Sequence, residues 1–342
     1  YQLIVDATSE AAVRRLRNCK HRSGRPFAVM VASLDEARRL ARCDVVECQS
    51  LRSPAGPIVV LKQQAATHIA SAVSPGLDTL GIMLPTTPMH SLFLNICQRP
   101  LVITSGNREG NPLEFEHEGA SSRLTDMADL WLEHDRPIRR PVDDSVVRII
   151  AGRVAVLRLA RGFAPLPLEV QSPTPLLAVG GHQKAAVALS NGEQAVLGPH
   201  VGDLDSVAER ERWEIQIADL LGLYGSSPSL FAGDRHPDYA STLWATQQKL
   251  RFVTVQHHHA HVVAGMIEHR WLDRTVLGAA FDGTGFGDDG TVWGGEFLMA
   301  SATGFRRVGH LLPFSLPGGD RAIREPWRVA VSLVQRAAGS ER

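Results

Sequence analysis

Several features are scarce in this 342-residue sequence, and each scarcity excludes a class of protein. Aromatic residues make up 6% of the chain and are scattered, so they form no stacking platform for single-stranded nucleic acid. The 36 basic and 36 acidic residues cancel, which argues against a general binder of nucleic acid or membrane surfaces and leaves room only for a local basic groove. No apolar run approaches the roughly 18 residues that a membrane-spanning helix needs.

Cysteine and lysine are also rare. The four cysteines form no Cys-x-x-Cys pair and have no histidine at zinc-site spacing, so we expect a reducing, cytoplasmic compartment. Only four of the 36 basic residues are lysines, and we attribute the arginine excess to codon usage. The first residues lack the layout of a secretory signal. The sequence begins without methionine inside an expected strand, so we expect it to be incomplete at that end.

The pattern of apolar runs predicts an α/β protein with two domains. Residues 1–168 alternate short apolar runs with helical patterns, and residues 145–159 read as a hairpin, so we expect a mixed sheet. Further strands are expected at residues 27–31, 57–61, 81–84 and 101–103. A proline-rich stretch blocks both helix and sheet, so we assign residues 169–175 as a linker.

The second domain is expected to span residues 176–342. It begins with a strand at residues 176–179, and Asn191-Gly192 between two apolar runs is a strong hairpin signal. The other elements expected here are a helix over 206–223, a strand over 252–255, a histidine-rich helix and a strand over 275–281.

The histidine-rich segment after the strand at 252–255 is the most specific motif. His257 and His261 are four residues apart, so they lie on one face of a helix, a spacing that suits two imidazoles on one metal ion. His258 and His259 are expected to point elsewhere. The alternative is a polar helix start whose histidines have structural roles. The identity of the metal and its remaining ligands stay open.

Glycine-rich segments in the second half are candidates for binding phosphate. Residues 281–290 form a predicted glycine turn after a strand, where backbone N–H groups can cradle phosphate and Asp282 can hold a magnesium ion or water. The alternative is an ordinary turn. Gly318-Gly319-Asp320 is similar, and Gly180-Gly181 with Lys184 lies beside the expected hairpin. This combination is typical of two-lobed actin-like ATPases.

Cationic residues in the first half are candidates for a second site. Lys20, Arg22 and Arg25 lie between a helix and a strand, where they can grip polyphosphate or an adenylate, or simply form a solvated helix end. Residues 104–107 follow a strand and place hydroxyl and amide groups at a sheet edge. Arg148, Arg158 and Arg161 can complete a cationic pocket. The remaining histidines without a partner at diagnostic spacing are assigned structural or surface roles: His21, His90, His117, His134 and His236.

These motifs together resemble the HypF family, the carbamoyltransferases of nickel–iron hydrogenase maturation. The matching stretches follow one order along nearly the whole chain. In the first half they are KHRSGRPFAVMV (20–31), SPGLDTLGIMLP (74–85), TSGNREGNP (104–112), HDRPI (134–138), DDSVVR (143–148) and RGFAPLP (161–167). They continue with GPHVGD (198–203), HPDY (236–239), residues 256–261, residues 281–297 and LPGGDRAIREPWR (316–328).

The resemblance implies a YrdC-like mixed α/β domain followed by part of a TsaD-like domain of the actin-like (ASKHA) fold. In that family the first domain forms carbamoyl adenylate from ATP and carbamate, which is released from carbamoyl phosphate. The second domain passes the carbamoyl group to the C-terminal cysteine of the partner HypE. The implied cofactors are ATP, Mg²⁺ and one further metal ion, iron or zinc. Neither a membrane nor a nucleic acid is an expected partner.

The resemblance also implies roles for individual residues. Lys20, Arg22, Ser105 and Asn107 match the family's nucleotide and carbonate positions, and we expect them to be catalytic. His257 and His261 match its metal-binding pair. The residues that match its nucleotide-binding positions are Arg148, Arg158, Arg161, Lys184, Asp282, Gly283, Thr284, Gly285, Gly318, Gly319 and Asp320.

The chain departs from the family pattern in several ways. The family's N-terminal acylphosphatase domain and cysteine-rich zinc region do not occur in it. The opening strands of the first domain and the second half of the TsaD-like domain, which supplies an aspartate ligand to the metal, are expected to be missing. We therefore expect the chain alone to be incompetent for the full reaction. Thr86 and Ser91 replace an aromatic residue and a histidine that are frequent in the family.

Three other functions compete. An enzyme of threonylcarbamoyl-adenosine synthesis uses the same two folds but needs a basic surface for tRNA. An antibiotic O-carbamoyltransferase carries the two modules in the opposite order. An inactive metal-binding scaffold is the remaining alternative. The neutral charge balance and the stretches at 281–297 and 317–328 favour HypF.

Overall fold

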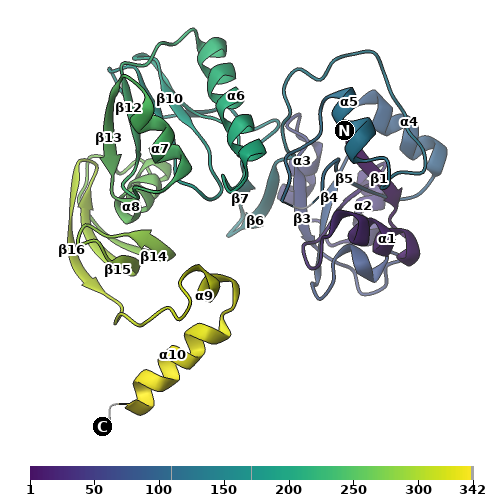
Figure 1. Ribbon diagram of the computed structural model, residues 1–342. Helices are drawn as coiled ribbons and strands as arrows, with labels where there is room; N and C mark the ends of the chain where they lie inside the picture. The colour runs from purple at the N-terminus through teal and green to yellow at the C-terminus, as the bar shows by residue number, and fades with distance from the viewer. Residues whose placement is uncertain (109, 171, 340–342) are drawn as a thin grey trace. The chain divides into compact units, whose positions relative to one another are not determined.

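The computed structural model describes residues 1–108, 110–170 and 172–339 (Figure 1). The described chain divides into two compact units. The first comprises Tyr1–Pro167, His182–Asn191 and Val196–Ser227, and the second comprises Leu168–Gly181, Gly192–Ala195 and the chain from Pro228 onward. No helix in the described residues is long and apolar enough to cross a membrane. The domain boundaries expected from the sequence stay a prediction.

A seven-stranded mixed sheet organises the first unit. Its strand order is β1-β5-β2-β4-β3-β6-β7. In chain order the strands are β1 (Gln2–Asp6), β2 (Ala28–Met30), β3 (Ile58–Lys62), β4 (Thr79–Met83), β5 (Leu101–Ser105), β6 (Val146–Ile150) and β7 (Arg153–Arg158). Strands β2 and β4 are parallel, as are β3 and β6, while the other neighbours are antiparallel. The expected mixed sheet and the 145–159 hairpin are confirmed.

The α-helices of the first unit each follow a polar residue. The helices are α1 (Glu10–Lys20), α2 (Leu34–Leu40), α3 (Val45–Arg52), the short 3-10 helix η1 (Ser71–Val73), α4 (Pro88–Cys97), α5 (His117–Arg123) and α6 (Val207–Tyr224). The side chain of Ser33 accepts a hydrogen bond from Glu36 N and so caps α2. Val13 and Leu16 of α1 are both buried in the core of the sheet, as their spacing predicts.

The second unit combines parallel and antiparallel strands. β12 (Leu230–Asp234) pairs in parallel with β9 (Leu176–Ala178) and with β13 (Arg251–Val255). A three-stranded antiparallel sheet has the order β14-β15-β16. Its strands are β14 (Val276–Phe286), β15 (Val292–Ser301) and β16 (Gly304–His310). Its helices are α7 (Ala240–Gln247), α8 (His257–Glu268), α9 (Asp320–Arg324) and α10 (Trp327–Ala338). Of the remaining short strands, β10 (Ala188–Ser190) belongs to the first unit, and the residues of β8 (Leu166–Leu168) and β11 (Ala195–Leu197) are divided between the two units.

Two glycines let α8 lie close against β14. A Cβ atom added to Gly278 would lie 2.4 Å from Val262 Cγ2 of the helix. One added to Gly285 would lie 2.5 Å from Cε1 of His258. Because real Cβ atoms do not approach other atoms so closely, larger residues at these positions would push the helix and strand apart. This close packing brings the first turn of α8 against the last residues of β14.

Two sequence predictions are wrong in detail. Residues 282–285 were expected in a turn, but β14 continues to Phe286, so they lie within a strand that shifts register between Phe281 and Gly285. The tight turn comes later, where Gly287 N donates to Thr291 O. The proline-rich stretch begins at Pro165, before the assigned linker, and was expected to exclude sheet throughout. β8 nevertheless forms at Leu166–Leu168, since a short strand can tolerate one proline that donates no ladder hydrogen bond.

Gly162 offers a test of the packing in the first unit. Its φ is +85°, and an added Cβ would lie 2.2 Å from the carbonyl oxygen of Ala55. We expect Gly162→Ala to lower the free energy of unfolding by about 3 kcal/mol, because backbone strain and a clash with backbone act together. Gly152→Ala is the matched control, since its φ is +75° with nothing within 4 Å, and should cost about 1 kcal/mol. If urea denaturation showed the same loss of unfolding free energy in both variants, the predicted clash with Ala55 would be wrong.

Candidate functional site

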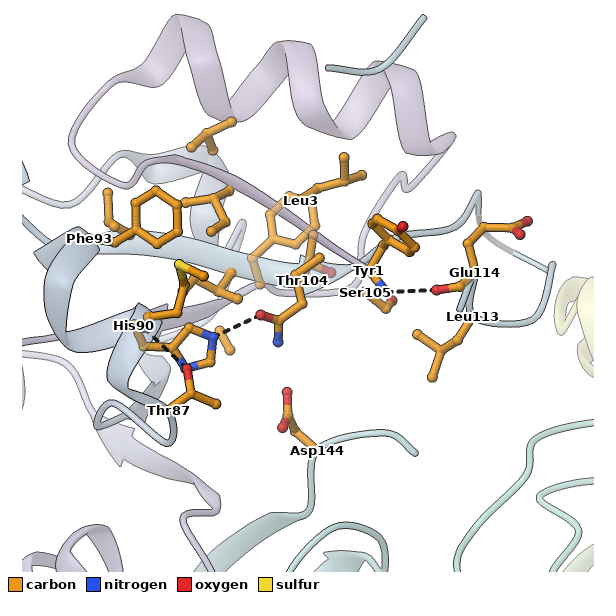
Figure 2. Close-up of a pocket in the computed structure, with 18 of the residues that line it drawn as sticks. Tyr1, Leu3, Thr87, His90, Phe93, Thr104, Ser105, Leu113, Glu114 and Asp144 are labelled. Atoms are coloured by element: carbon orange, nitrogen blue, oxygen red, sulfur yellow. Dashed lines mark hydrogen bonds between the residues drawn. The ribbon is translucent and has the colours of Figure 1, made fainter. Parts of the chain in front are cut away.

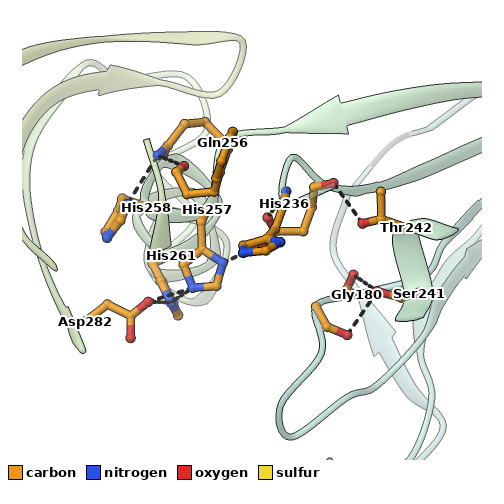
Figure 3. A network of polar contacts seen from close by, with 12 residues as sticks. Gly180, His236, Ser241, Thr242, Gln256, His257, His258, His261 and Asp282 are labelled. Carbon is orange, nitrogen blue, oxygen red and sulfur yellow. Dashed lines mark hydrogen bonds and ion pairs between the residues drawn. The ribbon is translucent and has the colours of Figure 1, made fainter. Parts of the chain in front are cut away.

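A cluster of two histidines and one aspartate lies where α8 meets β14 (Figure 3). His257 Nε2 and His261 Nε2 are 3.2 Å apart. Asp282 Oδ2 lies 2.7 Å from His257 Nε2 and 3.7 Å from His261 Nε2. The three ligand atoms therefore converge on one point, and α8 supplies two of them while β14 supplies the third.

Asp234 fixes the orientation of His257. Its Oδ2 accepts a hydrogen bond from His257 Nδ1 at 2.5 Å, while its Oδ1 accepts one from the main-chain N of His236. Since Nδ1 is the donor in this contact, Nε2 is the nitrogen left to bind a metal ion beside Asp282, as a metal-ligating imidazole requires. The Asp234 side chain is 6% exposed, so water does not compete strongly for this bond.

The charges of the cluster shift its protonation equilibria. The hydrogen bond to Asp234, and then the carboxylate of Asp282 nearby, raise the pKa of His257 to about 9, against the effect of burial. The contacts with His257 and His261 hold the pKa of Asp282 well below its usual range. In the absence of a cation, a proton on His257 therefore balances the two carboxylates. A metal ion would replace that proton and balance the charge of the two carboxylates in its place.

The donor set fits a transition-metal ion. Asp282 Oδ2 is buried and has no hydrogen bond among the described residues, although two ring nitrogens lie near it. Two imidazole nitrogens and a carboxylate oxygen are ligands that zinc and iron accept. Metal–nitrogen distances of about 2.1 Å in a tetrahedral site put neighbouring ligand atoms about 3.4 Å apart, close to the separation of the two histidine nitrogens.

Sequence reasoning missed the role of Asp234 and did not identify Asp282 as a third ligand. Asp234 ends β12 and pairs in register with Val255 of β13, which runs directly into the histidine helix. Because parallel strands bring their carboxyl ends to one sheet edge, an aspartate that ends a strand was a usable signal. The sequence pointed to Asp282 only as a carboxylate that could hold a magnesium ion or water, and its meeting with the two histidines depends on how β14 packs under α8.

The other second-half residues expected to bind nucleotide are dispersed. Gly283 and Thr284 lie in β14, and Gly283 N donates to Asp282 Oδ1 at 2.7 Å. Gly318 and Gly319 have positive φ and precede α9. The side chain of Asp320 lies outside what the structure describes. Lys184 belongs to the first unit, where its main-chain N donates to Asp203 Oδ1 at 2.7 Å.

In the first unit the structure brings Lys20, Ser105 and Asn107 together. Lys20 is 2% exposed, and its Nζ donates to Ser105 O, Asn107 O and Asn107 Oδ1 at 2.6, 2.6 and 3.0 Å. Ser105 Oγ donates to the same Asn107 Oδ1 at 2.6 Å. The buried ammonium thus orders the loop after β5 through its three donors.

A cleft of about 2680 Å³ opens beside this loop (Figure 2). Arg22, Ser105, Arg158 and Arg161 line it, whereas Arg148 is exposed on β6 and is not among the described lining residues. Asp144 faces the cleft and binds Arg161, with Oδ1 2.8 Å from Nη2, and its carbonyl accepts a hydrogen bond from Arg158 Nε. Sequence reasoning did not single out Asp144.

His90, which was assigned a structural or surface role from the sequence, also lines the cleft. Its Nε2 lies 2.9 Å from Gln2 Oε1, and its Nδ1 lies 3.2 Å from Thr86 Oγ1. Burial lowers the pKa of His90, so the ring is neutral near pH 7. The side chain is satisfied by its neighbours, which agrees with a structural role.

Comparisons with known families match both halves of the chain. A Sua5/YciO/YrdC model, described as telomere recombination, matches residues 1–160. The HypF Kae1-like domain matches residues 171–268, and the second subdomain of the carbamoyltransferase Kae1-like domain matches residues 278–342.

Individual relatives agree with these models. The carbamoyltransferase HypF of Synechocystis sp. is 43% identical over all of this chain, and the probable carbamoyltransferase HypF of Methanocaldococcus jannaschii is 32% identical over 96% of it. A crystal structure of full-length HypF in a phosphate- and nucleotide-bound form has a TM-score of 0.94 at 38% identity over 99% of the chain. T. kodakarensis HypF has a TM-score of 0.92 at 31% identity over 98%. The chain spans 44–45% of the length of each of these relatives.

The role of Asp234 can be tested by metal binding. We expect Asp234→Asn to weaken metal affinity by about 10- to 100-fold, because the amide leaves His257 free to adopt the wrong tautomer. Asp238→Asn changes an exposed carboxylate in the same loop and should leave the affinity unchanged. Competition with a chromogenic chelator measures both, and equal affinities in the two variants would contradict the proposed orientation.

The histidine pair gives a simpler prediction. We expect His257→Ala to purify without stoichiometric metal, because it removes one ligand and the contact that joins Asp234 to the cluster. Elemental analysis of the purified protein measures this. A variant that keeps one metal ion per chain would show that the ligands lie elsewhere.

Proposed function

The chain belongs to the HypF family of carbamoyltransferases, and from this we propose that a protein of full HypF length that carries it makes carbamoyl adenylate and transfers the carbamoyl group to a partner cysteine. The partner we propose is HypE, and the product serves the cyanide ligands of nickel–iron hydrogenase. The reaction would take place in the cytoplasm. Because the chain spans 45% of the Synechocystis relative, this proposal concerns the whole protein.

The first reaction fits the cleft of the first unit. Carbamate is a poor electrophile, so ATP must convert it into a mixed anhydride: a carbamate oxygen attacks the α-phosphorus and pyrophosphate leaves. Arg22, Arg158 and Arg161 line the cleft and carry charge that would stabilise the leaving pyrophosphate together with Mg²⁺. Lys20 would hold Ser105 and Asn107 in position for the carbamate.

The metal-site geometry is the observation that carries the second reaction. His257, His261 and Asp282 converge within one coordination sphere, and Asp234 orients His257. A bound ion, iron or zinc, would supply Lewis-acid polarisation of a ligand oxygen. In the transfer, the partner's thiolate attacks the carbamoyl carbon, the thioester bond forms, and AMP leaves with the electron pair of the broken C–O bond.

The competing functions find less support. Both Kae1-like models that match the second half are the HypF versions, and each of the relatives named above is a HypF protein. The chain carries the YrdC-type match before the Kae1-like one, which is the order opposite to that expected for O-carbamoyltransferases.

The full reaction can be tested with a protein of HypF length that carries this sequence. Incubated with ATP, carbamoyl phosphate and HypE, it should produce AMP and pyrophosphate and add one carbamoyl group to the C-terminal cysteine, as measured by mass spectrometry. Threonylcarbamoyl groups on tRNA, with no carbamoyl mass on HypE, would overturn the assignment. HypE with the cysteine changed to serine is the control acceptor.

Two variants should separate the half-reactions. We expect Arg22→Ala to slow ATP–pyrophosphate exchange roughly 100-fold, because it removes a cation from the cleft. We expect His257→Ala to keep that exchange and lose carbamoyl transfer to HypE. If His257→Ala abolished exchange as well, the assignment of the two reactions to two sites would be wrong.

A further inference from the structure

Thr86, His90 and Gln2 form a chain of hydrogen bonds that runs in one direction. The main-chain N of Thr86, which can only donate, lies 3.4 Å from His90 Nδ1, so this nitrogen accepts. Thr86 Oγ1, 3.2 Å from the same nitrogen, can donate to it as well. Burial lowers the pKa of His90, so the neutral ring carries its one proton on Nε2. His90 Nε2 therefore donates to Gln2 Oε1, 2.9 Å away (Figure 2).

The donor on His90 fixes the amide of Gln2. Because Oε1 accepts from the ring, the Nε2 end of the amide is turned away from the ring and presents its N–H groups to other acceptors. His90 is 7% exposed and so is held in the wall of the cleft, whereas the Gln2 side chain is exposed and lines the cleft. Each hydrogen bond in such a chain polarises the next, which strengthens the donor at its end.

Gln2 lies beside the loop proposed to hold the carbamate. In the pairing of β1 with β5, Gln2 is directly opposite Ser105. Directly opposed residues of an antiparallel pair have side chains on the same face of the sheet, with Cβ atoms about 5 Å apart. Both residues line the cleft. The charges of Asp144 and Arg161, which form an ion pair of 2.8 Å, also act on His90, so this pair borders the same part of the cleft.

We propose that Gln2 Nε2–H donates a hydrogen bond to the carbamate oxygen that does not attack ATP, and that His90 positions Gln2 for this contact. This inference rests on the carbamate reaction proposed above for the cleft and adds two residues to it. The two carbamate oxygens share one negative charge, and only one of them bonds to the α-phosphorus. A donor fixed on the second oxygen orients the first toward ATP. Because the amide is uncharged, it leaves more negative charge on the attacking oxygen than a cation in its place would.

The test uses a protein of full HypF length that carries this sequence, in an ATP–pyrophosphate exchange assay with freshly dissolved ammonium carbamate. Gln2→Leu should raise the KM for carbamate roughly tenfold, because one hydrogen bond to a charged oxygen is lost, and leave the KM for ATP within about twofold. Gln2→Glu can still accept from His90 but repels carbamate, so it should raise the KM for carbamate at least as much. Gln49→Leu, on the exposed side of α3 and outside the described lining of the cleft, should change neither KM.

A double-mutant cycle tests how His90 acts. His90→Phe removes the donor to Gln2 and should raise the KM for carbamate about three- to tenfold, because the amide is then free to turn. In the Gln2→Leu protein the same change should add less than about twofold, since the amide that His90 positions is already gone. His90→Gln, which can return an N–H near the position of Nε2, should recover part of the loss.

The outcomes separate the inference from the function on which it rests. An unchanged KM for carbamate in Gln2→Leu would overturn the inference. An equal rise in the KM values for carbamate and ATP would overturn it too, because Gln2 would then support the cleft as a whole. If the effects of His90→Phe and Gln2→Leu simply multiplied, His90 would not act through Gln2. A wild-type protein without carbamate-dependent exchange would instead overturn the reaction proposed for the cleft.

Discussion

The candidate metal site depends on how closely α8 lies against β14. Histidines on a helix can offer two ligands at one point, but an aspartate on a strand reaches that point only if the helix and strand nearly touch. Gly278 and Gly285 permit that approach, because any side chain there would meet Val262 or His258. The metal site therefore depends on this packing, and Gly285, which the sequence assigned to a phosphate turn, acts through its lack of a side chain.

The parts of this protein that local spacing determines were predictable from the sequence. The histidine pair and the 145–159 hairpin follow from periodicities of a few residues, and the structure confirms the elements that carry them. Asp282 and Asp234 come from β14 and β12, so their meeting with His257 depends on strand register and helix packing, which local patterns do not encode. The extension of β14 through its glycines was missed because cross-strand pairing with β15 outweighs the turn preference of those residues.

The lysine and the arginines of the first unit have different roles: Lys20 holds a loop, and the arginines line the cleft. Lys20 is buried, and its ammonium group donates three hydrogen bonds to carbonyl and amide oxygens of the loop that carries Ser105 and Asn107. The sequence marked Lys20 and this loop as parts of one site, and the structure joins them. The sequence did not indicate that the Lys20 ammonium is buried and hydrogen-bonded to the loop, while the arginines line the cleft.

The scarcity of lysine has a chemical consequence for the lining of that cleft. Eight arginines and no lysine occur among its described lining residues: Arg15, Arg22, Arg25, Arg99, Arg136, Arg140, Arg158 and Arg161. An amine that loses its proton attacks activated carbonyl groups, whereas a guanidinium keeps its charge and is a poor nucleophile. A carbamoyl adenylate held there would meet positive charge on the walls without meeting a lysine amine among the described lining residues.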